Sequence, residues 1–88
     1  MNKERRKALD KAIASLESIR GALDEVKSII ESTASEEREY YDNMNENLQG
    51  GDKGQQADNA ATLLEEVQST LEEFDVEELI TKINDAQQ

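Results

Sequence analysis

The sequence predicts an all-α protein folded as an antiparallel helical hairpin. Apolar residues recur at alternating steps of three and four on both sides of a central segment, and this spacing indicates helices that pack on other helices. The central segment holds three of the four glycines and both tyrosines, so it is the expected elbow. We expect a long helix over 3–43, an elbow over 44–54, a second helix over 53–74 and a short third helix over 76–86, all within a single domain, 1–88.

The first helix follows Asn2, whose side chain is a suitable N-cap. Its apolar residues form a coiled-coil-like heptad seam over about five heptads. The seam weakens at Thr33 and Glu37, toward the elbow. One seam position is Leu9, Leu16, Leu23, Ile30, Glu37 and Met44, the other is Ala12, Ile19, Val26, Thr33 and Tyr40, and Ile13, Ala22 and Ile29 flank them.

Small side chains form a stripe along the opposite side of this helix: Ala14, Ser18, Gly21, Ser28, Ser32 and Ser35. A glycine in a helix interior costs about 1 kcal/mol relative to alanine. Two interpretations stay open at this point. The stripe is either a docking or oligomer contact, where another surface approaches closely, or a solvated face without a partner.

The elbow is rich in residues with turn chemistry. Asn43 is expected to start a short turn that runs through Leu48, and Gly50, Gly51 and Gly54 are expected to permit backbone angles that other residues avoid. Tyr41 and Leu48 are expected to pack the elbow against the helices, beside Asp42. The spacing does not fit a calcium loop, because glycine and glutamate are missing from the positions that such a loop requires.

The elbow also carries a resemblance. The run from Glu36 to Gln49, which includes Tyr41-Asp42-Asn43-Met44-Asn45-Glu46-Asn47-Leu48-Gln49, follows a Lys/Arg-rich start and precedes glycines and an acidic Leu/Ala helix. This pattern resembles a group of small acidic helical proteins of bacteriophages and prophages. Asn45 stands where their pattern has proline, and the C-terminal segment departs from their uninterrupted Ala/Leu repeat. The resemblance implies a phage or bacterial origin and supplies no activity.

The second helix combines a seam with an acidic outer face. The seam is expected to consist of Ala57, Ala60, Leu64, Val67, Leu71 and Phe74. Acidic residues at heptad spacing, with their neighbours, form an expected ridge in solvent, which we take as a candidate partner-binding surface: Asp58, Glu65, Glu66, Glu72 and Glu73.

The apolar register changes after Phe74, where Asp75 and Glu78 have the spacing of a capping box. We expect a break there, with a continuous helix as the alternative. The third helix brings Val76, Leu79, Ile80 and Ile83, which need burial by another surface.

An isolated hairpin of 88 residues buries little apolar surface, so we expect a homo-oligomer, most simply a dimeric four-helix bundle. Residues 1–20 hold six bases and three acids, whereas residues 21–88 hold four bases and eighteen acids. The hairpin is expected to set the basic residues of 3–11 beside the acidic stretch 72–78, within one chain or across a dimer.

The composition argues against several classes of function. The chain contains no histidine and no cysteine, which removes the commonest general base and thiolate chemistry. We therefore expect that the protein is not an enzyme and that it binds no cofactor and no metal ion. The net charge of −11 disfavours nucleic acid and membrane as partners and favours a basic protein surface.

Two functions remain, both in the cytoplasm of a bacterial host. One is an acidic decoy that inhibits a nucleic-acid-handling or defence protein of the host. The other is a structural module that assembles through its helical seams.

Overall fold

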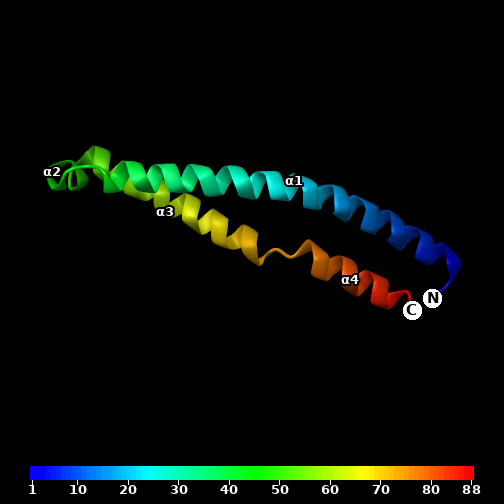
Figure 1. Ribbon diagram of the computed structural model, residues 1–88. Helices are drawn as coiled ribbons and strands as arrows, with labels where there is room; N and C mark the ends of the chain where they lie inside the picture. Colours follow the sequence, from blue (N-terminus) through cyan, green and yellow to red (C-terminus); the bar gives the residue numbers. More distant parts are fainter. The chain divides into compact units, whose positions relative to one another are not determined.

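The computed structural model describes all 88 residues and contains helices without strands. The elements are α1 (Lys3–Asp42), α2 (Glu46–Gln49), α3 (Asp52–Glu73) and α4 (Val76–Ala86). The predicted all-α, hairpin-like architecture is confirmed, and the expected break between the second and third helices is present (Figure 1). None of these helices combines the length and apolar character that crossing a bilayer requires.

The chain divides into two compact units, and α1 contributes to both. The first unit comprises Met1–Glu25 and Phe74–Gln88, and thus the first part of α1 with α4. The second unit comprises Val26–Glu73, and thus the rest of α1 with α2 and α3.

In the first unit, α4 lies against α1 with Val76 and Ile80 buried. The Arg20 guanidinium forms an ion pair with Glu77, and Gln87 Nε2 donates a hydrogen bond to Asp10 Oδ1 at 3.3 Å. The expected burial of the third helix is thus confirmed for two of its residues, whereas Leu79 stays 40% exposed.

These two contacts correct the expected pairing of charges within one chain. Glu77 lies beside Arg20 and Gln87 beside Asp10, so residues near 77 do not reach residues 3–11 of the same chain. The reason is length: a helix rises 1.5 Å per residue, and α1 with 40 residues is almost twice as long as α3 with 22, so α3 ends well before it reaches the start of α1.

In the second unit, α3 runs back along α1 after the elbow (Figure 1). Its buried residues are small: Ala34 of α1, and Gly54, Ala57 and Ala61 of α3. No large side chain anywhere in the chain is fully buried. The fully buried part of the contact between these two helices is therefore made of small residues, while Ile30 of α1 and Leu64 and Leu71 of α3 are half-buried.

Three polar side chains cap helix starts. The Oδ1 atoms of Asn2 and Asp75 accept hydrogen bonds from the backbone N–H groups of Arg5 (2.8 Å) and Glu78 (3.2 Å), so both predicted caps are confirmed. The Glu78 side chain pairs with Lys82 at 3.1 Å, so only half of a capping box forms. In the elbow, Asn45 is the N-cap of α2, and its Oδ1 accepts a hydrogen bond from the backbone N–H of Leu48 at 2.9 Å.

The seam prediction for α1 is right at one heptad position and wrong at the other. Leu9, Leu16, Leu23 and Ile30 are half-buried, but Ile19, Val26, Thr33 and Tyr40 are exposed. The second inward position lies one residue later, at Ile13, Arg20, Lys27, Ala34 and Tyr41. The second seam prediction is right in part: Ala57 is buried and Ala60, Leu64 and Leu71 are half-buried, but Val67 and Phe74 are exposed and the buried Ala61 was not predicted. Sequence spacing did not distinguish these neighbouring stripes, because both alternate steps of three and four.

The glycine prediction is wrong in its physical reason. No glycine has a positive φ. Gly54 lies buried in the first turn of α3, where an added Cβ would lie 2.5 Å from the Cα of Gln49 and would collide with the backbone oxygens of Leu48 and Gln49. The elbow thus needs Gly54 for the close approach of α2 and α3.

Replacing two glycines of helices with alanine should have opposite effects. Gly54→Ala overpacks the α2–α3 contact and should lower the free energy of unfolding by about 1–3 kcal/mol. Gly21→Ala, where an added Cβ meets nothing within 4 Å, should raise it by about 1 kcal/mol through helix propensity. Urea unfolding followed by circular dichroism, at equal chain concentrations, measures both. Equal effects of the two changes would contradict the steric account.

Candidate functional site

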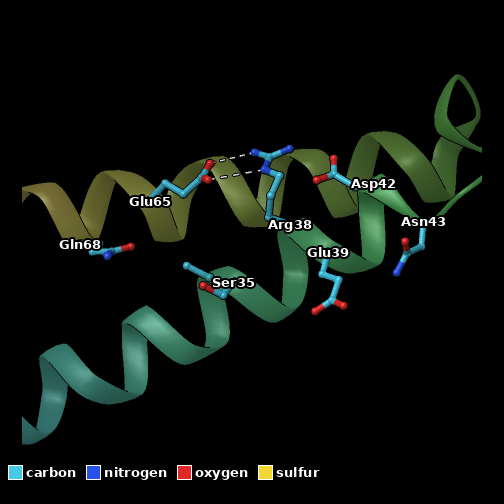
Figure 2. Close-up of a pocket in the computed structure, with 8 residues that line it drawn as sticks. Ser35, Arg38, Glu39, Asp42, Asn43, Glu65 and Gln68 are labelled. Atoms are coloured by element: carbon cyan, nitrogen blue, oxygen red, sulfur yellow. Dashed lines mark hydrogen bonds and ion pairs between the residues drawn. The ribbon is translucent and has the colours of Figure 1, made fainter.

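The strongest polar cluster of the second unit centres on Arg38 of α1. Its Nη1 donates to Asp58 Oδ1 at 2.9 Å, and its Nη2 donates to Glu65 Oε1 at 2.8 Å. Nη2 also lies 3.3 Å from Thr62 Oγ1, and Nε donates weakly to Glu65 Oε2 at 3.5 Å. Figure 2 shows the guanidinium of Arg38 directed at the Glu65 carboxylate. One arginine therefore joins α1 to two successive heptads of α3.

The surroundings hold this guanidinium in place. Hydrogen bonds with Glu65, and then with Asp58, raise the pKa of Arg38 above its usual range, so the guanidinium keeps its charge at every accessible pH. The guanidinium carbon lies 5.6 Å from the centroid of the Tyr41 ring, within the range of a cation–π contact.

A shallow groove runs beside the cluster. Figure 2 shows the polar side chains that border it. Its lining comes from both helices and the start of the elbow: Ala34, Ser35, Arg38, Glu39, Asp42, Asn43, Glu65 and Gln68. Arg38 donates hydrogen bonds to Asp58 and Glu65 beside this groove. The main role of Arg38 is therefore to clamp α1 against α3. Sequence reasoning missed Arg38, although an isolated base in an acidic region signals such a role.

The predicted acidic ridge divides into two parts. Asp58 and Glu65 bind Arg38 at the margin of the α1–α3 contact, although their side chains remain 51% and 47% exposed. Glu66, Glu72 and Glu73 are exposed. Glu72 borders a small groove with Lys27 and Glu31, and Glu66 lies beside the exposed Leu63 and Val67.

The predicted elbow residues have different surroundings. Tyr41 is half-buried, and its backbone oxygen accepts a hydrogen bond from Gln49 Nε2 at 3.0 Å. Asp42 ends α1, and the backbone N–H of Asn43 extends its last turn by donating to Glu39 O at 3.0 Å. The prediction for Leu48 is wrong, because its side chain is 49% exposed while its backbone meets Gly54.

The small-residue stripe is exposed along α1, and its role stays a prediction. Open space surrounds Gly21. Ser35 lines the groove beside Arg38. Ala14, Ser18, Ser28 and Ser32 are all exposed.

A second apolar surface lies on the second unit, where the sequence predicts that most of its residues pack between the two helices. Ile29 of α1 is 57% exposed and Leu63 of α3 is 51% exposed. Together with their exposed neighbours they form a set that we call the apolar face: Val26, Ile29, Thr33, Tyr40, Leu63 and Val67. The signal was present in the sequence, since the apolar stripe of α1 is wider than one helix contact needs.

Comparison with known proteins does not assign a family. No family model matches the chain, and neither the curated proteins nor the solved structures contain a significant match. The functional argument therefore depends on the residues and their surroundings.

Arg38→Lys should reduce the thermal stability, because an ammonium cannot hold Asp58 and Glu65 with the same fork of donors. The loss relative to the wild type should shrink at high salt, which screens exposed charge pairs. Thermal unfolding followed by circular dichroism at low and high salt measures it. Arg5→Lys is the control, because Arg5 lies exposed in the first turns of α1. Equal effects of the two changes would argue against the clamp.

Proposed function

We propose that this protein is a non-enzymatic helical protein-binding module that assembles with further copies of itself. One observation carries the proposal: the buried apolar residues of the chain are three alanines, one valine and one isoleucine, whereas larger apolar residues stay exposed. Small domains are marginally stable even with a well-filled core. A second surface that covers the exposed residues supplies the missing burial.

The total surface supports this reading. The chain exposes 6555 Å². A compact monomer of 9.9 kDa exposes about 5200 Å². The excess is comparable to the roughly 800 Å² that each partner buries in a standard protein interface.

The setting that we propose is the cytoplasm of a bacterial host. Its support is the elbow sequence from Tyr41 to Gln49, which resembles proteins of bacteriophages and prophages. The proposal includes no cofactor. A chain with net charge −11 repels nucleic acid and anionic membranes, so the proposed partners are proteins.

Sedimentation equilibrium tests the assembly directly. We expect a mass that is a multiple of 9.9 kDa at micromolar chain concentration. Because the association buries apolar residues between acidic chains, added salt should leave it unchanged or strengthen it. A monomer at all concentrations and salt levels would contradict the proposal.

An acidic decoy for a basic host protein is the second candidate, and a different observation favours it. Glu66, Glu72 and Glu73 stay exposed close together along α3. Duplex DNA presents one negative charge per about 1.7 Å, and carboxylates on a rigid helix imitate part of this array. Binding of this kind depends on charge and therefore weakens with salt.

Capture from bacterial lysate, with stepwise elution by salt and mass spectrometry, tests the decoy. We expect a host nucleic-acid-handling or defence protein to elute at moderate salt. Combined Glu66→Lys, Glu72→Lys and Glu73→Lys should abolish the capture. The control combines Glu4→Lys, Glu17→Lys and Glu25→Lys, which change the net charge equally on α1 and should leave it intact. Equal losses from the two sets would leave only a general charge effect and contradict a specific surface.

A further inference from the structure

The residues of the apolar face lie on one side of the second unit. On a helix that turns 100° per residue, Val26, Ile29, Thr33 and Tyr40 fall within an arc of about 60°, centred about 150° from Arg38. On α3, the same geometry puts Leu63 and Val67 almost opposite Asp58 and Glu65, about 170° away around the axis. Because Arg38 binds both carboxylates, the ion pairs mark one side of this antiparallel pair. The apolar face therefore occupies the other side, and both helices contribute to it.

The apolar face carries no formal charge, although 35% of the chain is charged. Its one aliphatic hydroxyl is satisfied internally, since Thr33 Oγ1 donates to Ile29 O at 2.8 Å. The methyl group of Thr33 thus remains free for contact. The face itself can therefore be buried without removing a charged group or an unpaired threonine hydroxyl from water. The one remaining polar group is the hydroxyl of Tyr40, at the edge of the face.

We infer that the apolar face of the second unit is the contact for a second copy of this chain, and that two such hairpins form a four-helix bundle. This inference rests on the proposed assembly function and assigns its surface. A two-fold axis would bring the face of one copy onto the same face of the other, as in most homodimers.

The distribution of side-chain sizes selects a second copy as the occupant. Between α1 and α3 within one copy, the fully buried apolar side chains are alanines and Ile30, Leu64 and Leu71 are half-buried, whereas Val26, Ile29, Leu63 and Val67 stay exposed on the face. A helix in a four-helix bundle needs two apolar stripes, one for each neighbour, and α1 has both. A pair of helices with heptad-spaced apolar residues packs well on another pair with the same spacing. A second copy of this chain supplies such a pair.

The charges around the face determine how its binding responds to salt. Glu25, Glu36 and Glu66 are exposed acids next to members of the face in the sequence or one helical turn away, so anionic surfaces are repelled. Acidic edges on both copies also repel each other, and salt relieves this repulsion. A basic protein on the same face would respond in the opposite way, because salt would weaken its attraction.

Thiol footprinting tests the assignment, because the chain contains no cysteine. Thr33→Cys places a thiol on the apolar face, and Ser35→Cys places one two residues away, in the groove beside Arg38. As the chain concentration rises through the association range, alkylation of the thiol at 33 should slow at least about tenfold, as expected for a site buried in a dimer. Alkylation of the thiol at 35 should stay unchanged.

A matched pair of lysine substitutions provides the second measurement. Val67→Lys and Ser35→Lys change the net charge equally, but only the first puts an ammonium on the apolar face. Val67→Lys should raise the dissociation constant of the dimer at least about 100-fold, as loss of a central contact does, while Ser35→Lys should not weaken it. Sedimentation gives the constants, and circular dichroism at equal concentration checks the helix content.

The outcomes separate this inference from the proposed function. If the protein assembles while the thiol at 33 stays reactive and Val67→Lys has no effect, the contact lies elsewhere and the inference is overturned, but the assembly function stands. Protection at 35 alone would overturn it in favour of the groove side. A wild-type chain that never associates would overturn both.

Discussion

The fold of the second unit depends on the small size of the side chains between α1 and α3. Ala34, Ala57 and Ala61 allow two helices to approach closely, and close approach gains dispersion contacts along the backbones. The same choice limits how much apolar surface the hairpin buries by itself. Ile30 and Leu64 are half-buried along this contact, whereas their sequence neighbours Ile29 and Leu63 stay exposed at its side. A tight pair of helices and an exposed apolar face are therefore two consequences of one constraint.

The elbow also requires a small residue where two backbone segments approach closely. Gly54 lets α3 begin against the backbone of α2, and Asn45 caps α2 through the N–H of Leu48. This short helix fixes where α3 starts and hence which of its residues lie opposite α1. The clamp of Arg38 on Asp58 and Glu65 follows from that register, since both carboxylates lie on the α3 turns that face it. Turn geometry and ion pairing thus specify the same alignment.

Local chemistry predicted the helices well because their ends are coded locally. Asn2 and Asp75 cap helices with their own side chains, and no distant residue is needed to recognise them. The facing side of α1 was harder to predict, since a stripe with Ile19 and a stripe with Arg20 both follow alternating steps of three and four. The stripe with Arg20 looked too polar to face another helix. A long basic side chain can nevertheless line a contact with its aliphatic stem while its charged head stays in water. Predicting the Arg38 cluster would have required the register between α1 and α3, and the spacing of residues within one helix does not give that register.

In the proposed assembly, association and folding are coupled. A copy whose buried residues are mostly alanine gains little from folding alone, whereas covering Ile29, Leu63 and Val67 adds the burial of large apolar side chains. Stability then depends on chain concentration, because mass action favours the folded state that binds. Salt separates the forces involved: it weakens the Arg38 clamp and relieves repulsion between acidic copies. The high negative charge thus limits association at low salt, and apolar burial provides the force that overcomes it.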